Sequence, residues 1–262
     1  MSGAISLLTD FGLADTYVGQ VKGAIATVAP EVRVIDLTHD VPAHDVRTGA
    51  FLLMTSVEAF PPGTVHLAVV DPGVGSARRP VAAASARGDR LVGPDNGLLV
   101  AALERLGGLV AAVDISAESN WGSRRSTTFH GRDLFAPVAA RLARGAEIAS
   151  LGSRVDVLST PFQLPAPQVD ARGAVRGEVL HVDKFGNLVT NIAAQLLPQR
   201  FSVRVGDAVI RGAPHLHYAA VSHGELVSLV GSAGYLEVSA RDASASLRTQ
   251  ASRGDPVIIE PG

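Results

Sequence analysis

The residues best suited to chemistry in this sequence stand together after an apolar segment, residues 64–70. Asp71 follows that segment, a Pro72-Gly73 turn comes next, and Arg78 and Arg79 lie a few positions further on. The segment is typical of a buried strand, and open α/β sheets bind ligands at the carboxyl ends of their strands. A carboxylate there, beside fixed positive charge and a glycine that lets the backbone approach a ligand, predicts a functional site.

A second aspartate, Asp10, holds the same position after the short apolar segment 4–8. We expect Asp10 to face the same crevice as Asp71, where a carboxylate suits the two hydroxyls of a ribose; the alternative is a turn residue. Asp15 precedes a predicted helix, and it either caps that helix or joins the site, since aspartate is a favoured N-cap.

Other polar segments leave alternatives open. His39 and His44 follow another strand segment, and they either edge the pocket or belong to a turn with a helix cap. Asp95, between Pro94 and Asn96, indicates a plain turn. His130 and Asp133 precede a predicted helix, either as a loop histidine and a cap or at a helix N-terminus that favours negative charge. One histidine and one aspartate are too few for a zinc site, and we predict no metal.

In the second half of the chain, Asp183, Asn187 and Asn191 interrupt what should be a strand pair. The plain interpretation is a Gly-Asn turn. The alternative is an adenine site, in which Phe185 stacks on the base and Asn187 reads the base edge.

Composition bounds the possible functions. The chain has 262 residues, a formal net charge of −2 and no cysteine. The charge gives no reason to expect nucleic acid or a membrane as partner, and the lack of cysteine excludes thiolate catalysis and fits a reducing cytoplasm. The N-terminus has no basic region of a signal peptide, and no apolar run reaches the ~18 residues of a membrane span. The sequence also lacks a complete dinucleotide fingerprint, a Walker A loop and a nucleophile elbow.

The predicted elements divide the chain in two. Strand and helix signals alternate in residues 1–160, which predicts a layered, Rossmann-like α/β domain. A proline-rich connector at 161–167 precedes residues 168–262, where short strands predict an all-β barrel. Strands are expected at 4–8, 32–37, 64–70, 81–84, 90–92, 109–114, 174–182, 188–192, 201–205, 208–210, 226–230, 235–238 and 257–260, and helices at 18–28, 45–60, 98–106 and 133–143.

Six of these segments occur in the order of one family, and the chain resembles the S-adenosyl-L-methionine (SAM) hydrolases, also called SAM hydroxide adenosyltransferases, which are related to fluorinase and chlorinase. The resemblance covers nearly the whole chain. It rests on Thr9-Asp10-Phe11-Gly12, Val70-Asp71-Pro72-Gly73-Val74-Gly75, Pro94-Asp95-Asn96-Gly97-Leu98, Phe129-His130-Gly131-Arg132-Asp133, Asp183-Lys184-Phe185-Gly186-Asn187 and Ser232-Ala233-Gly234-Tyr235-Leu236-Glu237.

The resemblance implies an α/β domain, a C-terminal β-barrel and a cytoplasmic homotrimer that binds SAM between subunits without a cofactor. It also implies a catalytic set of Asp71, Arg78 and His130, and hydrolysis of SAM to adenosine and L-methionine. The halogenating relatives lack this set, so its presence points to water as the nucleophile.

The family's substrate contacts carry over onto both halves of the chain. Asp10 would hold the ribose, Phe129 and Gly131 would line the C5′ region, and His44 stands where the halogenases place a tryptophan. Asp183 and Ser232 would bind the methionine ammonium and carboxylate. Phe185, Asn187 and Tyr218 would surround the adenine. Glu237 completes the set of substrate-binding residues.

Two departures from the family pattern stand close together. Ala233 replaces an arginine that the halogenases use for the methionine carboxylate, and residues 239–244 differ from the usual glycine-rich stretch.

The predicted mechanism is attack of water on C5′ with methionine leaving as a neutral thioether. Asp71 or His130 accepts the proton of the water, and the sequence does not rank them. Two alternatives are a halide-dependent adenosyltransferase and a non-catalytic SAM or adenosine sensor.

Overall fold

The computed structural model describes residues 3–159 and 165–262. Its internal contacts divide the chain into two compact units, residues 1–163 and 164–262. The first part of the predicted connector, residues 161–164, lies outside the described residues. Each unit is described by itself.

The first unit is built on a seven-stranded mixed sheet with the order β2-β1-β3-β5-β4-β6-β7. The strands β2, β1, β3 and β5 run parallel to one another, whereas β4, β6 and β7 are antiparallel to their neighbours. Their bounds are β1 Ala4–Thr9, β2 Arg33–Thr38, β3 Val65–Val69, β4 Pro80–Ser85, β5 Arg90–Pro94, β6 Leu109–Asp114 and β7 Ser153–Arg154.

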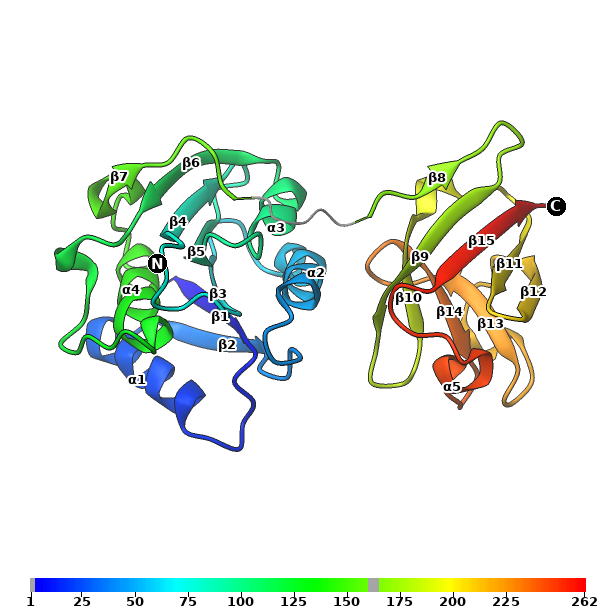
Figure 1. The fold of residues 1–262 in the computed structure, drawn as a ribbon, viewed down its shortest axis with the longest axis horizontal. Helices are drawn as coiled ribbons and strands as arrows, with labels where there is room; N and C mark the ends of the chain where they lie inside the picture. The colour runs from blue at the N-terminus through cyan, green and yellow to red at the C-terminus, as the bar shows by residue number, and fades with distance from the viewer. Residues whose placement is uncertain (1–2, 160–164) are drawn as a thin grey trace. The chain divides into compact units, whose positions relative to one another are not determined.

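Helices cover both faces of this sheet (Figure 1) because the central strands are apolar on both sides. In β3, Val65, Leu67 and Val69 pack on the face of α1 and α4, while Ala68 packs on the face of α2 and α3. Strands buried on both faces read as continuous apolar runs. The helices are α1 Tyr17–Val28, α2 Val46–Ser56, α3 Val100–Arg105 and α4 Ala136–Ala143, with short turns η1 Val57–Ala59, η2 Glu118–Asn120, η3 Gly131–Phe135 and η4 Ile148–Leu151.

In this unit the structure decides one open alternative and overturns one expectation. Asp15 does not cap α1, because Thr16 takes the N-cap position and its hydroxyl accepts from Gln20 Nε2 at 2.8 Å. The helix predicted for 133–143 begins as the π-helical turn η3 and becomes α-helical only at Ala136. Such turns often occur at functional sites, since the extra residue redirects neighbouring side chains.

The parallel strands bring the predicted acids to one edge of the sheet. Leu8 pairs with Ala68 and Thr9 with Val69, so β1 and β3 end side by side. Asp10 follows β1 directly and Asp71 comes two residues after β3. The expectation that these carboxylates share an edge is therefore correct.

The second unit is an eight-stranded antiparallel sheet that curls into a nearly closed barrel. Its path is β12-β11-β15-β9-β10-β14-β13, with β8 paired to β9. A bridge between His215 and Leu229 joins the end of β12 to β13. The strands are β8 Gln168–Val169, β9 Val175–Val182, β10 Leu188–Ala193, β11 Phe201–Val205, β12 Ala208–Ala213, β13 Leu226–Val230, β14 Tyr235–Ala240 and β15 Pro256–Pro261, with η5 Ala194–Leu196, η6 Tyr218–Ala220 and α5 Ala245–Thr249.

The barrel interior is filled by alternate residues of these strands, as in β11, where Phe201, Val203 and Val205 are buried and Arg204 is exposed. The predicted fold class, a Rossmann-like α/β part followed by a β-barrel, is confirmed. Within the described ranges, the helices are all too short or too polar to cross a membrane.

Candidate active site

The loop after β3 approaches the segment that leads to His130. Gly75 has a φ of 78°. Residues with a Cβ atom are strained in this backbone conformation, whereas glycine adopts it readily. A Cβ atom built on Gly75 would lie only 2.7 Å from the carbonyl oxygen of Thr127. Glycine is therefore required twice over, and it lets the loop that carries Arg78 lie directly against the segment before His130.

Asp71 and Arg78 form a two-pronged ion pair within this loop. Arg78 Nε donates to Asp71 Oδ1 at 2.9 Å, and Arg78 Nη2 donates to Asp71 Oδ2. Both side chains are largely buried, with 9% of Arg78 and 6% of Asp71 exposed. The Arg78 guanidinium also lies over the Phe135 ring, 5.3 Å from its centroid. Paired hydrogen bonds of this kind define the position of both groups.

His130 joins the pair through the same guanidinium nitrogen. Arg78 Nη2 lies 3.0 Å from His130 Nδ1. A guanidinium nitrogen only donates, so Nδ1 must accept, and the proton of the neutral imidazole then sits on Nε2. The three residues predicted as catalytic are thus brought together around Arg78.

The surroundings favour the neutral imidazole. Burial lowers the pKa of His130, and the positive charge of Arg78 lowers it further, while Asp71 and Asp133 act in the opposite direction. The same two causes that lower this pKa preserve Nδ1 as an acceptor for Arg78.

One guanidinium nitrogen is left for a bound molecule. Arg78 Nη1 is buried and finds no acceptor among the described residues. An unsatisfied buried donor is costly, so its presence beside Asp71 and His130 indicates a site that a polar ligand or water completes.

Asp10 ties the end of β1 to the loop before α2. Its Oδ2 accepts from the backbone nitrogen of His44 at 2.9 Å, and His44 has a φ of 67°. The next residue, Asp45, caps α2 through Thr48, with Oδ1 accepting from the Thr48 nitrogen at 3.0 Å. Asp10 and His44 are therefore in contact, and the side chain of His44 is exposed.

Phe129 and Gly131 flank His130 and lie in an aromatic cluster. The Phe129 ring is 5.7 Å from Phe11 and 5.3 Å from Tyr17, centroid to centroid. A Cβ on Gly131 would touch both Phe11 and Phe129 at 3.4 Å. Phe11 and Tyr17 belong to this aromatic cluster, although the site predicted from the sequence did not include them. The only sequence signal for them was their proximity to Asp10 in the chain.

In the second unit, Asp183 organises its own turn. Its Oδ1 accepts from the backbone nitrogens of Phe185 and Asn187, each at 2.9 Å, and its Oδ2 accepts from Asn187 Nδ2 at 2.9 Å. Phe185 is 76% exposed at the tip of this turn. The turn interpretation of this segment therefore holds, and it also fixes the Asn187 amide and presents the Phe185 ring.

Glu237 and Tyr218 form a second cluster in this unit. Glu237 is 7% exposed, and its Oε1 accepts from Tyr218 Oη and from Ser239 Oγ, each at 2.7 Å. Burial, the hydrogen bond to Glu237 and the nearby charge of Asp183 raise the pKa of Tyr218 to about 12. Ser239, in the stretch that departs from the family pattern, is thus a partner that the sequence did not identify.

Ser232 lies in the tight turn between β13 and β14, where Gly234 N donates to Gly231 O at 2.9 Å. Its side chain is exposed. No described contact links Ser232 to Glu237 or Asp183, so its place in a methionine site stays a prediction.

Several other polar residues have structural partners. Asp95 accepts from Arg79 Nε at 2.8 Å and from the backbone of Ser159. Asp133 does not cap a helix, because Arg132 holds its carboxylate at 2.6 and 2.9 Å. His39 Nδ1 bonds to Thr9 Oγ1 at 2.8 Å beneath the surface. Across residues 3–159 and 165–262, no cluster of three or more histidine or acidic side chains has the makings of a metal site.

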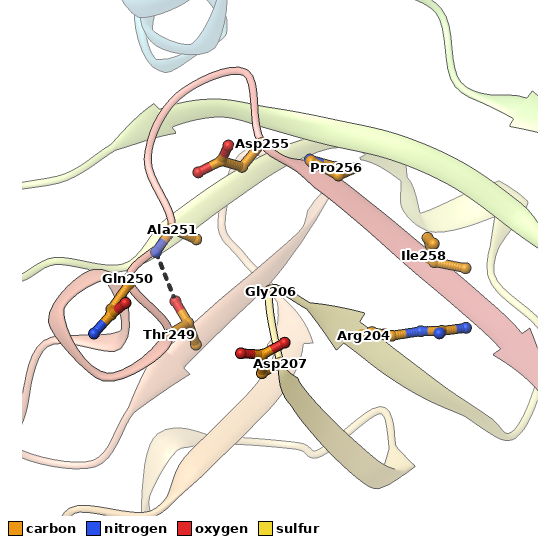
Figure 2. A pocket seen from close by; sticks show the side chains of 9 residues that line it. All are labelled: Arg204, Gly206, Asp207, Thr249, Gln250, Ala251, Asp255, Pro256 and Ile258. Atoms are coloured by element: carbon orange, nitrogen blue, oxygen red, sulfur yellow. Dashed lines mark hydrogen bonds between the residues drawn. The ribbon is translucent and has the colours of Figure 1, made fainter.

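The second unit also has a cleft of about 360 Å³ lined by none of the predicted residues. Figure 2 shows it between the turn after β11 and the end of α5. Its polar side chains include Arg204, Asp207 and Asp255. Arg204 pairs with Glu260, and Asp255 with Ser252, so two of these charged side chains already have partners within the second unit.

Comparison with known proteins gives consistent matches along the chain. The family models for the SAM hydroxide adenosyltransferase N-terminal and C-terminal domains match residues 5–152 and 177–258. An (R)-S-adenosyl-L-methionine hydrolase from Salinispora tropica is 45% identical over 262 residues, covering 98% of each protein. A fluorinase from an Actinoplanes species is 30% identical over 212 residues, covering 72% of this chain and 71% of the fluorinase. The crystal structure of an uncharacterized conserved protein from Thermotoga maritima matches with a TM-score of 0.91 and 35% identity, over 97% of this chain and 99% of that chain.

Proposed function

The chain belongs to the SAM hydroxide adenosyltransferase family, and from this membership and the site geometry we propose that it hydrolyses SAM. Water attacks C5′ of the adenosyl group, the bond from C5′ to sulfur breaks, and its electron pair stays on sulfur. The products are adenosine, L-methionine and one proton. The sulfonium leaves as a neutral thioether, so the leaving group needs no acid.

The observation that carries this proposal is the arrangement of Asp71 and His130 around a single guanidinium. Arg78 holds Asp71 through two hydrogen bonds and His130 Nδ1 through a third. A water molecule beside such a set is placed by several hydrogen bonds before it reacts, which lowers the entropic part of the barrier.

The tautomer of His130 separates the roles of the two candidate bases. With Nδ1 engaged by Arg78, the Nε2 proton of His130 is available to donate to the oxygen of the water. Asp71 accepts only one described bond at each oxygen, and each oxygen has a further lone pair. We therefore assign proton acceptance to Asp71 and orientation of the water to His130. Proton acceptance by a positioned side chain typically raises the rate by about 10²–10⁴-fold.

The remaining predicted residues are proposed to bind substrate. Asp10 suits the ribose hydroxyls, because it stands at the carboxyl end of β1 and its Oδ2 already accepts from His44 N, which fixes the carboxylate in place. Phe129 and Gly131 suit the C5′ region next to His130. In the second unit, the carboxylates of Asp183 and Glu237 suit the positively charged end of SAM.

We also propose a preference for the R configuration at sulfur. The support is the printed name of the hydrolase relatives, which specifies that epimer. Incubation with a mixture of sulfur epimers, followed by NMR of the residual SAM, tests it directly. Consumption of both epimers at equal rates would remove this part of the proposal.

The proposal includes a cytoplasmic homotrimer that works without a cofactor. The support is the family resemblance and the lack of cysteine, which suits a reducing compartment. Light scattering coupled to size-exclusion chromatography measures the subunit number, and a monomeric or dimeric mass would contradict the trimer.

The decisive experiment uses the purified chain, SAM and water enriched in ¹⁸O, with and without chloride. Hydrolysis at C5′ predicts adenosine that carries one ¹⁸O atom, released at the same rate with or without the salt. Unlabelled adenosine would exclude attack of water at C5′. A 5′-chlorinated nucleoside would indicate halide transfer, and an intact SAM pool would indicate a sensor.

A further inference from the structure

The only tryptophan of the chain lies against the histidine of the proposed site. The Trp121 and His130 ring centroids are 5.1 Å apart, and the two planes are nearly perpendicular at 85°. Phe135 contacts the same imidazole edge-on, at 6.4 Å and 73°. Trp121 has no role in the mechanism above, and nothing in the residue pattern marked it as part of the site.

The segment that carries Trp121 is held by buried hydrogen bonds. Asn120 is 1% exposed, and its Nδ2 donates to the carbonyl oxygen of Ile115 at 3.0 Å. Arg141 of α4 donates from Nη2 to the Asn120 carbonyl at 2.7 Å and from Nη1 to Asn120 Oδ1 at 3.2 Å. A side-chain amide satisfied on both atoms in the interior fixes the backbone next to it.

The indole itself is also anchored. Trp121 Nε1 donates to the carbonyl oxygen of Ser116 at 3.2 Å, and Gly122 N donates to the carbonyl oxygen of Asp133 at 2.8 Å. The second bond joins this segment to η3, the π-helical turn that starts immediately after His130. Rotation of the indole away from the imidazole would break its bond to Ser116, and a shift of the backbone would break the bond from Gly122 to Asp133.

We propose that Trp121 is a positioning residue for His130, which holds the imidazole plane so that Nδ1 stays on Arg78 and Nε2 stays directed at the reacting water. The inference rests on the proposed function of His130, although the contact itself does not. The Trp121 and Phe135 rings both pack edge-on against the imidazole, and these contacts restrict its rotation about the Cβ–Cγ bond. Without Trp121, rotation about the Cβ–Cγ bond of His130 becomes accessible, and that rotation replaces Nδ1 at the guanidinium with the carbon Cδ2, which accepts no hydrogen bond.

The charged groups around this contact are known from the structure. Arg78, Asp71 and Asp133 act on the imidazole. Arg125 lies over the Trp121 ring at 5.8 Å and pairs with Glu118. An imidazolium in contact with indole quenches its emission more strongly than a neutral imidazole. The fluorescence of this chain, which has one tryptophan, therefore reports the protonation of His130.

The first experiment is a fluorescence titration of the full chain without substrate. We expect Trp121 emission to fall as the pH is lowered below 6.5, with one midpoint that disappears in His130→Gln. His223→Gln is the matched control, because His223 is exposed in the second unit beside Asp242, and its titration should match the wild type. Emission that does not titrate, or a midpoint that survives in His130→Gln, would overturn the contact whether or not SAM is hydrolysed.

The second experiment compares Trp121→Leu with Trp121→Phe. Leucine should lower kcat roughly threefold to tenfold, the effect of losing one edge-on aromatic contact, with KM for SAM nearly unchanged. The acid limb of kcat should move to higher pH, because the imidazole becomes more hydrated. Phenylalanine should restore most of both properties. Unchanged kcat and an unchanged acid limb in a folded Trp121→Leu protein would refute positioning, and if that variant does not fold, the titration of the wild type decides.

Discussion

The two units hold the acids of the candidate site in different ways. In the first unit, Asp71 is bound by the guanidinium of Arg78, which also binds His130. In the second unit, Asp183 is bound by backbone and side-chain amides, and Glu237 by the hydroxyls of Tyr218 and Ser239. The donors named for the second pair are all neutral, whereas the acid of the first unit has a cationic partner.

This difference teaches what each region is suited to bind. An acid that is paired with arginine has its charge compensated, so it can orient and accept from a neutral molecule such as water. The hydrogen bonds named for the acids of the second unit come from neutral donors, which leaves these carboxylates suited to attract a cationic ligand. SAM has a sulfonium and an ammonium, so the contrast agrees with chemistry in the first unit and substrate binding in the second.

The strongest test of the contrast is Asp71→Asn. The amide keeps the shape of the carboxylate but cannot accept the proton of the water, and we expect kcat to fall by about 10²–10⁴-fold with KM little changed. Steady-state release of adenosine measures both constants. Asp207→Asn, in the cleft of Figure 2, is the control and should behave as the wild type. Full activity of Asp71→Asn would remove the proposed acceptor.

A second prediction separates the units by their response to acid. Burial lowers the pKa of His66 to about 4. Because an unfolded histidine titrates near 6.5, the unfolded chain binds a proton between pH 6.5 and 4 that the native state does not bind. The free energy of unfolding should therefore fall with falling pH through this window, by on the order of 3 kcal/mol in total, and should be unaffected by His66 above it.

Hydrogen exchange at pH 7, 6 and 5 locates this effect. His66 is completely buried in the first unit, where Ser6 Oγ lies 2.7 Å from its Nδ1. We expect protection of β1 and β3 to decline more steeply than protection of the barrel strands. Equal decline in the two units would show that another group dominates the acid response.

A third prediction concerns the approach of two loops in the first unit. Gly75→Ala adds a Cβ that must move away from the Thr127 carbonyl and strains a positive φ, at a cost of about 1–3 kcal/mol. We expect kcat to fall as well, since Arg78 and His130 are moved apart. Gly63→Ala is a matched control, because Gly63 also has a positive φ, 86°, but nothing lies within 4 Å of its added Cβ. Equal kcat values for the two variants would contradict the proposed coupling.

The smallest expected effect is in the second unit. Tyr218→Phe removes one of the two described donors to Glu237 Oε1, a change of about 1 kcal/mol, so KM for SAM should change about fivefold with kcat nearly constant. The raised pKa of Tyr218, about 12, means that this difference should persist across neutral pH. A loss confined to kcat would place Tyr218 with the chemistry and remove the contrast between the units.

Most of the fold was predictable because its signals are local. The apolar segments 4–8 and 64–70 became β1 and β3 within one residue at each end. The π-helical turn at Gly131–Phe135 was not predictable, since its apolar spacing does not differ from that of an α-helix start. Asp15 has the residue type of a cap, yet Thr16 takes that position.

The sequence alone placed two arginines, Arg78 and Arg79, a short glycine-containing loop after Asp71, and the structure decided that Arg78 pairs with Asp71 while Arg79 pairs with Asp95. The sequence also determined that Asp10 and Asp71 share an edge, since parallel strands end together. Only the tertiary structure decided which nitrogen of His130 meets Arg78, and that Trp121 lies against the imidazole. Those contacts depend on packing between segments far apart in the chain, where small rotations of a ring decide which atom accepts and which donates.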